Sequence, residues 1–354
     1  MSLLKYWEAL GVWGTRKSRQ KDSDLELKQK KMFTPLTAKE IQNIKNLWGG
    51  IKLNYKYFEL YKTGHDEVDS RYIPDDIYYT IVDPYFNKPI DCRYIDDKNL
   101  YDLLFSDVKQ PKTVARKENG QFISASYELI TEKEVLSACV EIGKVVIKKS
   151  TNANGGESIY FWGNDNSTKS LEVLKNILKK DFDFVIQECV KQHSEMAKLH
   201  PTSINTIRIL TLNWHGEVRV LSSIIRMGAN GSNVDNGHSG GVFCGIDETG
   251  RLKNCAYNYM TGQKFENTHP TSGAVFSDSV IPNFDECKDL VCKLAPRITS
   301  FSRLTSDLSI TEDGEPILIE VNLAYGGLFF HQIANGPVFG NITKDIIDEV
   351  ISAK

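Results

Sequence analysis

The segment 307–322, DLSITEDGEPILIEVN, constrains the fold of this chain more than any other stretch. Its Asp-Gly step is a strong signal for a two-residue β-hairpin loop, because such turns favour residues that tolerate left-handed backbone. A loop of these two residues pairs Glu312 with Glu315 and places Asp307 directly opposite Glu320. Apolar and polar residues alternate along both arms, as in strands that bury one face. The segment therefore predicts a hairpin with one apolar and one polar face.

The polar face of this hairpin presents three oxygen-bearing side chains together, those of Asp307, Glu320 and Asn322. Two carboxylates opposite each other across a strand pair repel one another. A divalent cation between them removes that cost, and a set of oxygen ligands suits Mg²⁺ or Mn²⁺ beside substrate phosphates. A solvated polar face with a shifted register is the alternative, and the pattern alone favours neither.

The composition of the chain excludes several classes of protein. Its 354 residues are 41% hydrophobic and 25% charged, which is typical of a soluble globular protein with more than one domain. The 43 basic and 46 acidic residues leave no basic surplus, so we expect no nucleic-acid partner. The seven cysteines include no CxxC pair, which argues against a disulfide framework and a zinc site. Because no apolar run reaches membrane-spanning length and no signal peptide is evident, we expect a cytoplasmic protein.

The N-terminal arm, residues 1–48, has a pattern of its own. Residues 1–14 carry apolar side chains at helical spacing, and a basic, polar stretch follows. The favoured interpretation is a helix that docks on the protein itself, and contact of residues 1–31 with an anionic membrane is the alternative. Thr37 and Glu40 have the spacing of a capping box, which predicts the start of a helix there.

The rest of the chain alternates between strand-like and helix-like stretches. Strand patterns dominate residues 205–246 and recur after residue 111. Helical spacing marks residues 132–141, 170–180, 285–294 and 343–352. Mixed sheets with helices packed on them predict an α+β (mixed α/β) protein.

A second informative segment joins a strand that ends at Lys148 to a small-residue loop with Gly155, Gly156 and Ser158. Paired glycines let backbone N–H groups approach phosphate oxygens, and a lysine at the strand end can reach a phosphate as a point charge. No Gly-Lys-Ser/Thr follows, so this is not a P-loop, and a plain hairpin loop is the favoured interpretation of this segment alone. A third apolar strand, at 184–190, ends in polar groups whose backbone can contact adenine.

Taken in order, these segments resemble the ATP-grasp superfamily and, within it, the sugar-transfer-associated ATP-grasp family. The resemblance extends from Ile51 to Val350. It rests on RYIPDD at 71–76, DDKNLYDLLF at 96–105, Lys148 with its loop, QECVKQHSEMAKL at 187–199, PTSINTIRILT at 201–211, VDNGHSGGVFCGID at 234–247 and EVNLAYGG at 320–327.

The resemblance implies an ATP-grasp fold that holds its nucleotide between two α+β subdomains, with an additional N-terminal region. We expect a helical arm over 1–48 and an N-terminal domain over 49–125. The small ATP-grasp subdomain, with the lysine and the glycine-rich loop, is expected over 126–190. The large subdomain, with the metal site, is expected over 191–354.

The resemblance also implies which residues bind the nucleotide and the metal. Lys98 and Lys148 are the expected phosphate lysines, and the glycine loop is expected to close over the phosphates. The remaining expected ligands are Gln187, Glu188 and Val190 for adenine, Glu195 for ribose, and Asp307, Glu320 and Asn322 for magnesium.

The chain departs from the family pattern at two places. Lys149 stands where a proline often follows the second lysine. No arginine lies just before Asp307 or just after Asn322, where many members keep one for the transition state. Arg226 is the first candidate to replace it, and Arg208 and Arg303 are the others.

The chemistry implied by the resemblance is that of an ATP- and Mg²⁺ (or Mn²⁺)-dependent ligase. A carboxylate attacks the γ-phosphate to form an acyl phosphate, and an amine then displaces phosphate. Arg226 and Arg208 are candidates to orient the acyl phosphate, and His238 or His193 is a candidate base for the amine. The expected substrates are a small carboxylate and an amine, linked to sugars in polysaccharide or sugar-conjugate biosynthesis.

Three alternatives remain beside this ligase. The same nucleotide site could serve a phosphotransferase, or a non-catalytic nucleotide-binding module. The GHSGG sequence also matches the nucleophile elbow of serine hydrolases, but a strand pattern follows Ser239 where that motif needs a helix.

Overall fold

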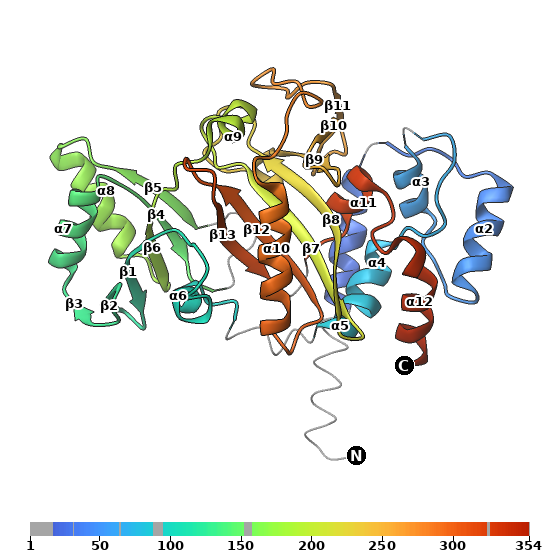
Figure 1. The fold of residues 1–354 in the computed structure, drawn as a ribbon, viewed down its shortest axis with the longest axis horizontal. Coiled ribbons are helices and arrows are strands. Elements are labelled where there is room, and N and C mark those ends of the chain that lie inside the picture. The colour runs from blue at the N-terminus through green and yellow to red at the C-terminus, as the bar shows by residue number, and fades with distance from the viewer. Residues whose placement is uncertain are drawn as a thin grey trace, which may run out of the picture.

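The computed structural model of the chain describes residues 17–30, 32–63, 65–87, 95–151, 158–323 and 326–353, and of His238 only the backbone. The described residues form two antiparallel sheets that lie next to each other, with helices packed on them (Figure 1). The predicted mixed α+β class is therefore confirmed.

The smaller sheet has six strands, in the spatial order β3 (Leu129–Ile130), β2 (Gln121–Ser124), β1 (Thr113–Glu118), β6 (Phe184–Glu188), β4 (Lys144–Lys149) and β5 (Ile159–Gly163). Helices α7 (Glu132–Ile142) and α8 (Thr168–Leu178) cover one face and share its apolar core. Side chains alternate along β4, so Val145 and Ile147 join this core while Val146 and Lys148 face the opposite side. This alternation turns Lys148 toward the second sheet.

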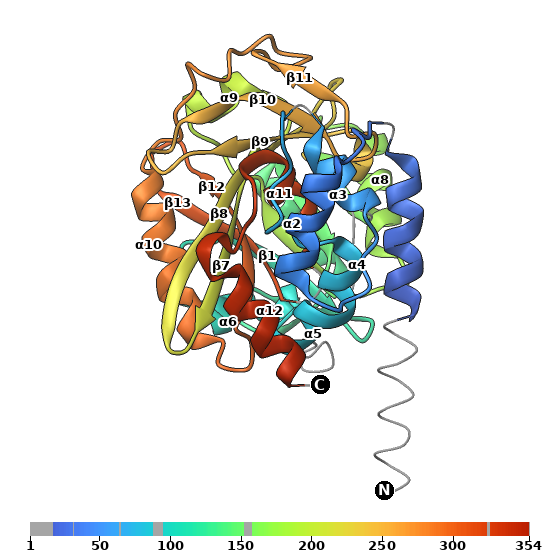
Figure 2. The same ribbon diagram turned by 90° about the vertical axis from the view of Figure 1, so that its right-hand side faces the viewer.

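The larger sheet has seven strands, in the order β11 (Lys264–Glu266), β10 (Leu252–Asn258), β9 (Val242–Ile246), β8 (Glu217–Met227), β7 (Thr206–Trp214), β12 (Arg303–Ile310) and β13 (Pro316–Asn322). Helix α10 (Phe284–Leu294) covers one face and α11 (Phe329–Asn335) the other, as Figure 2 shows. Strand β13 is an edge strand, and β12 lies one strand further in.

The N-terminal helices pack on the α11 side of the larger sheet. Thr37 caps the first turn of its helix and Glu40 binds back to the Thr37 amide, so the predicted capping box is confirmed. The predicted C-terminal helix is confirmed as α12 (Thr343–Ser352). The other elements here are a helix over residues 17–29, α2 (Ala38–Trp48), α3 (Lys56–Lys62), α4 (Asp75–Ile77), a π-helical turn η1 (Tyr78–Val82) and α5 (Asp83–Phe86). The apolar pattern of residues 1–14 lies outside the described residues.

The hairpin of β12 and β13 places Asp307 opposite Glu320, as predicted, but its loop differs from the prediction. The Thr311 amide bonds to the Glu315 carbonyl, so the predicted pair Glu312–Glu315 is wrong and the loop has one residue more. Gly314 is the last residue of this three-residue loop. Its φ of +88° is the left-handed backbone conformation that such a hairpin requires there. A bulge between positions 307 and 308 then restores the predicted register at the polar face.

Short elements complete the described fold. They are η3 (Lys98–Leu100), α6 (Tyr101–Leu104), α9 (Ser194–Leu199), η4 (Gly237–Ser239), η5 (Ala295–Arg297) and η6 (Gly340–Ile342). Within the described ranges, no helix combines the length and the apolar character that crossing a bilayer requires.

Candidate active site between the two sheets

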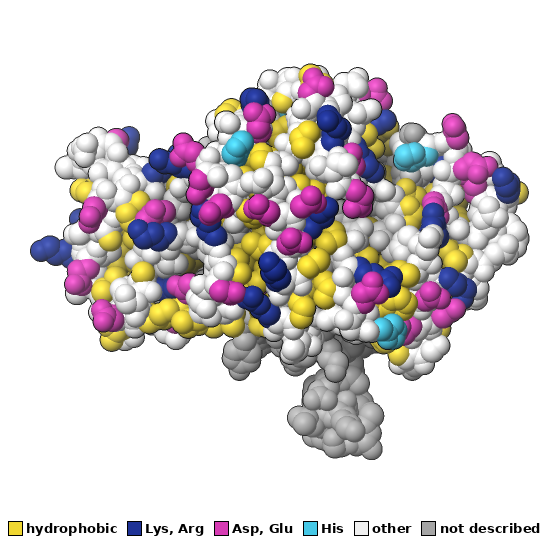
Figure 3. All heavy atoms as spheres, in the orientation of Figure 1, with side chains coloured by type: hydrophobic (Ala, Val, Ile, Leu, Met, Phe, Trp, Pro, Cys, Tyr) yellow, Lys and Arg dark blue, Asp and Glu magenta, His cyan; other side chains and the backbone are white. Residues whose placement is uncertain are grey.

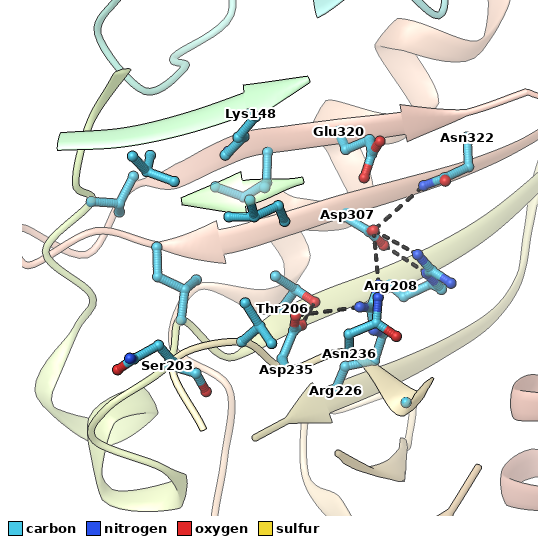
Figure 4. A pocket seen from close by; sticks show the side chains of 18 of the residues that line it. Lys148, Ser203, Thr206, Arg208, Arg226, Asp235, Asn236, Asp307, Glu320 and Asn322 are labelled. Atoms are coloured by element: carbon cyan, nitrogen blue, oxygen red, sulfur yellow. Dashed lines mark hydrogen bonds and ion pairs between the residues drawn. The ribbon is translucent and has the colours of Figure 1, made fainter. Parts of the chain in front are cut away.

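A cleft of about 810 Å³ lies between the two sheets and is lined from both. Lys148 faces it from the smaller sheet, and the larger sheet contributes Arg208, Arg226, Asp307 and Glu320 (Figure 4). On the face drawn in Figure 3, basic and acidic side chains are mixed. In the cleft, by contrast, cations gather around Asp307. Other residues that line the cleft include Lys98, Glu188, Val190, Thr206, Asp235, Ile319 and Asn322.

Asp307 is the centre of this charge cluster. The carboxylate is 2% exposed and accepts two hydrogen bonds of 2.7 Å from Arg208, one to each oxygen. Arg226 donates at 3.1 Å and the Asn322 amide at 3.4 Å, both to Oδ2. Burial alone would raise the pKa of Asp307, but the charges of Arg208 and Arg226 and the hydrogen bonds from Arg208 and Asn322 together outweigh it and hold the pKa below its usual value.

Strand register explains why these groups meet. Arg208 on β7 and Glu320 on β13 are both cross-strand partners of Asp307 on β12. Arg226 comes from the next strand, β8, and its Nη2 lies 3.3 Å from a carboxylate oxygen of Asp235. The Arg226 Nε is buried and has no hydrogen-bond partner among the described residues. Two guanidinium groups are thus fixed side by side at the floor of the cleft, one with an unused donor.

The two predicted phosphate lysines both line the cleft but lie in different electrostatic surroundings. The Lys98 Nζ is 2.7 Å from Oε1 of Glu320. Burial would lower the pKa of Lys98, but the interaction with Glu320, together with Tyr101 and Asp96, outweighs burial and raises the pKa. Burial lowers the pKa of Lys148 to about 8, although Glu320 acts in the opposite direction. Lys98 and Lys148 thus line the same cleft as the two arginines, and these cationic side chains are suited to contact a polyanion.

Not every predicted site residue faces the cleft. Glu188 and Val190 line it, whereas Gln187 is buried in the sheet with its amide 3.4 Å from the Pro111 carbonyl. Glu195 pairs at 2.6 Å with Lys198, outside the described lining. Ser158, with a φ of +64°, is not among the described lining residues either. Gly155, Gly156 and the His238 side chain lie outside the described residues.

Three further candidates have roles elsewhere in the fold. Arg303 is buried against Asp83 at 2.7 Å and lies away from the cleft, unlike the other two candidate arginines. The His193 ring accepts a hydrogen bond from the Glu195 amide at the start of α9. Ser239 ends the short turn η4 and is followed by strand β9, so the helix required for a nucleophile elbow is not formed there.

One wall of the cleft is the helix over residues 17–29, which belongs to the predicted helical arm, but its place on the cleft was not predicted. Arg19, Asp22, Ser23 and Glu26 line the cleft from this helix. The Tyr259 hydroxyl donates to Glu26 at 2.6 Å, and the Tyr259 ring stacks on Phe330 with centroids 4.5 Å apart. The helix buries few apolar side chains, so hydrophobic periodicity could not reveal it.

The residues present fit a divalent cation only in part. Among the described residues, no group of three or more His, Cys, Asp or Glu side chains could hold a metal ion. Glu320 and Asn322 offer oxygen atoms at the cleft, as Mg²⁺ prefers. Both oxygens of Asp307 are already engaged by arginine. A cation that arrives with nucleotide phosphates would therefore meet Glu320 and Asn322 first.

The fold and the cationic cleft together are those expected of an ATP-grasp protein. The sequence matches the model of the sugar-transfer associated ATP-grasp family over residues 81–347, so the chain belongs to this family. The predicted family and the ATP-grasp fold are thereby confirmed. None of the curated protein sequences compared with the chain matches it.

Several solved structures of ATP-grasp proteins and synthetases align with this chain. The ATP-grasp ligase PsnB with its minimal precursor aligns at 14% identity and a TM-score of 0.41, over 76% of this chain and 64% of that chain. D-alanyl-alanine synthetase A from Vibrio cholerae O1 biovar eltor aligns at 12% identity and a TM-score of 0.41, over the same shares. D-cycloserine synthetase DcsG aligns at 10% identity and a TM-score of 0.41, over 73% of this chain and 69% of that chain. The chain thus spans 64% of the length of the first two.

Proposed function

We propose that this chain is an ATP- and Mg²⁺-dependent ligase that activates a carboxylate as an acyl phosphate and transfers the acyl group to an amine. The observation that carries the proposal is the pair of guanidinium groups fixed by Asp307 at the floor of a cleft that also holds two lysines. Such a site brings cationic side chains to a triphosphate and to an acyl phosphate within one cavity. Membership of the ATP-grasp family supports the same function.

The nucleotide is assigned to the side of the cleft that faces the smaller sheet. Lys148 and Lys98 bind its phosphates, and Glu188 and Val190 contact adenine through the backbone. Lys98 moves from Glu320 to the phosphates, and the carboxylate of Glu320, with Asn322, would hold the cation. When bound, the cation offsets the negative charge of the phosphates.

The reaction itself is assigned to the floor of the cleft. A carboxylate oxygen of the substrate forms a bond to the γ-phosphorus, while the bond from this phosphorus to the bridging oxygen breaks and ADP leaves. Arg226 and Arg208 orient the acyl phosphate through planar, charge-assisted hydrogen bonds. The amine then forms a bond to the acyl carbon, phosphate leaves with the electrons of the C–O bond, and His238 is the candidate that accepts the amine proton.

The biological setting belongs to the proposal as well. The family description links the chain to sugar transfer, so we assign the carboxylate or the amine to a sugar-linked intermediate of polysaccharide or sugar-conjugate biosynthesis. The six described cysteines are all free thiols, which supports a reducing, cytoplasmic location.

Product analysis distinguishes this ligase from its alternatives. The full chain would be incubated with ATP, Mg²⁺ and a panel of carboxylates, each with and without hydroxylamine as a small amine. A ligase forms ADP, inorganic phosphate and a hydroxamate in equal amounts, and only when carboxylate and amine are both present. A phosphotransferase forms ADP and a phosphorylated product already without hydroxylamine, and in that arm it releases no free phosphate. A non-catalytic module binds ATP and forms no ADP.

A further inference from the structure

Asp307 and Glu320 face each other across the hairpin, yet their partners differ in kind. Asp307 lies on β12, one strand in from the edge, where Arg208 grips both of its oxygens and Arg226 shares one. Glu320 lies on the edge strand β13, and its ion-pair partner in the described structure is the single ammonium of Lys98. Asp307 is therefore held by two planar guanidinium groups, whereas Glu320 is held by one ammonium group on a flexible side chain.

The cost of freeing each carboxylate follows from this difference. A cation that binds Asp307 directly must displace guanidinium groups that are about nine-tenths buried. Arg226 would keep its pair with Asp235, but Arg208 would lose the carboxylate that holds it. A cation that binds Glu320 displaces only the Lys98 ammonium, which can move to a nearby phosphate. The register shift beside Asp307 also leaves Ile319 as the extra residue of β13, and Ile319, Glu320 and Asn322 all line the cleft.

We propose that Asp307 is a positioning residue that fixes Arg208 and Arg226, and that Glu320 and Asn322 hold the nucleotide-bound cation without it. The inference rests on the proposed nucleotide site and deepens it, because it separates an oxoanion subsite at the two arginines from a cation subsite at the sheet edge. Asp235 also forms an ion pair with Arg226, and it accepts a hydrogen bond from the Thr206 hydroxyl.

The experiment measures two ligands on the full chain. Binding of Mn²⁺ to the ADP complex is followed by the enhanced relaxation of water protons, which separates the protein-bound ion from Mn²⁺ held by ADP in solution. Binding of inorganic phosphate to the ADP complex is followed by calorimetry. The variants are Asp307→Asn and Glu320→Gln, and Asp313→Asn in the exposed hairpin loop is the matched control.

The proposal predicts a crossed pattern of affinities. Asp307→Asn keeps its Mn²⁺ affinity within about threefold and loses phosphate affinity by about tenfold or more. Glu320→Gln loses Mn²⁺ affinity by about tenfold or more and keeps its phosphate affinity. A residue with a purely structural role would move both affinities together. An equal loss of Mn²⁺ binding in the two variants would overturn the proposal.

Two further outcomes keep the test decisive. If Asp307→Asn does not fold, Arg208→Lys replaces it, because lysine keeps the charge but cannot occupy both carboxylate oxygens. A metal-ligating Asp307 would then bind Mn²⁺ more tightly, whereas the proposal predicts no change. Wild-type protein that binds ADP and Mn²⁺ but no phosphate overturns the oxoanion subsite alone. Wild-type protein that binds no nucleotide contradicts the proposed function and the inference with it.

Discussion

Lys98 and Glu320 form a 2.7 Å ion pair that ties the two halves of the cleft together. The Lys98 amide donates to the Ser150 carbonyl, directly after strand β4 of the smaller sheet. Its side chain meets Glu320 on the edge strand of the larger sheet. Lys98 thus contacts the smaller sheet through its backbone and a carboxylate of the larger sheet through its side chain.

Replacing Lys98 tests this link. Lys98→Met leaves Glu320 without its cation in a mostly buried position, so we expect a loss of about 1–3 kcal/mol of unfolding free energy, below the ~3–5 kcal/mol of a fully buried pair. Urea denaturation measures this loss. Lys39→Met is the control, because Lys39 pairs with Glu67 at the exposed surface, where such pairs contribute about 0–1 kcal/mol. Equal effects of the two substitutions would contradict the account.

The lowered pKa of Lys148 makes nucleotide binding depend on pH. Its pKa of about 8 in the folded protein, against 10.5 for an ordinary lysine, means that the ammonium is lost as the pH rises through 8. If only the ammonium form binds phosphate, nucleotide affinity falls about tenfold between about pH 7 and about pH 9. Between these two pKa values the unfolded chain binds more protons at this residue, so its contribution to stability increases with pH.

Lys148→Met provides the test of that pH dependence. Equilibrium binding of an unreactive ATP analogue is measured across the same pH range for wild type and variant. We expect a weak and nearly pH-independent affinity in the variant. A decline as steep as that of wild type would assign the titration to another group.

The helix over residues 17–29 is held on the cleft by Lys30. The buried Lys30 ammonium donates to the Tyr259 carbonyl and lies 4.3 Å above the Phe329 ring. Lys30→Met removes the hydrogen bond and the cation–π contact, so we expect the helix to detach more often. Hydrogen exchange of the amides of residues 17–29 should accelerate by about tenfold or more. Lys28→Met, at an exposed position of the same helix, should leave exchange unchanged, and equal rates in both variants would refute this anchor.

The Arg303–Asp83 pair is expected to stabilise the fold without taking part in binding. Both side chains are fully buried, and Arg303 also donates to the Leu323 carbonyl at the end of β13. Asp83→Asn leaves this guanidinium uncompensated, so we expect a loss of about 3–5 kcal/mol. Chemical denaturation measures the loss, and the affinity for the ATP analogue should change by less than about threefold. An intact stability with impaired binding would instead place Arg303 in the active site.

The hairpin shows how far sequence reasoning reached, and why. The alternation of apolar and polar residues identified the polar face, because burial of the other face is a strong constraint on register. The loop was predicted one residue too short, and the bulge beside Asp307 was not foreseen. The two errors cancel at Asp307 and Glu320, since each shifts the register by one residue in the opposite sense. A bulge depends on contacts across the sheet that a single sequence does not contain.

The partners of the charged residues were beyond prediction for a similar reason. Arg208 in TIRIL and Arg303 in FSRLT lie in strand-like segments of similar composition, yet Arg208 faces the cleft and Arg303 is buried against Asp83. Only the pairing of β12 with β7 brings Arg208 to Asp307. The place of residues 17–29 on the cleft was not predicted, because within this helix Leu27 is the one buried apolar residue and the polar Ser23 is buried as well, which leaves little apolar periodicity.

Nucleotide binding tests the central claim most directly. The melting temperature of the full chain is measured with and without a saturating unreactive ATP analogue and Mg²⁺, in wild type, Lys148→Met, Glu320→Gln and Asp313→Asn. A ligand that binds only the folded protein stabilises it by mass action, by about 2.7 kcal/mol at a hundred times its Kd. We predict a Mg²⁺-dependent rise in wild type and Asp313→Asn that is reduced in the other two variants. The absence of any rise, or an equal rise in all four proteins, would contradict a nucleotide site in this cleft.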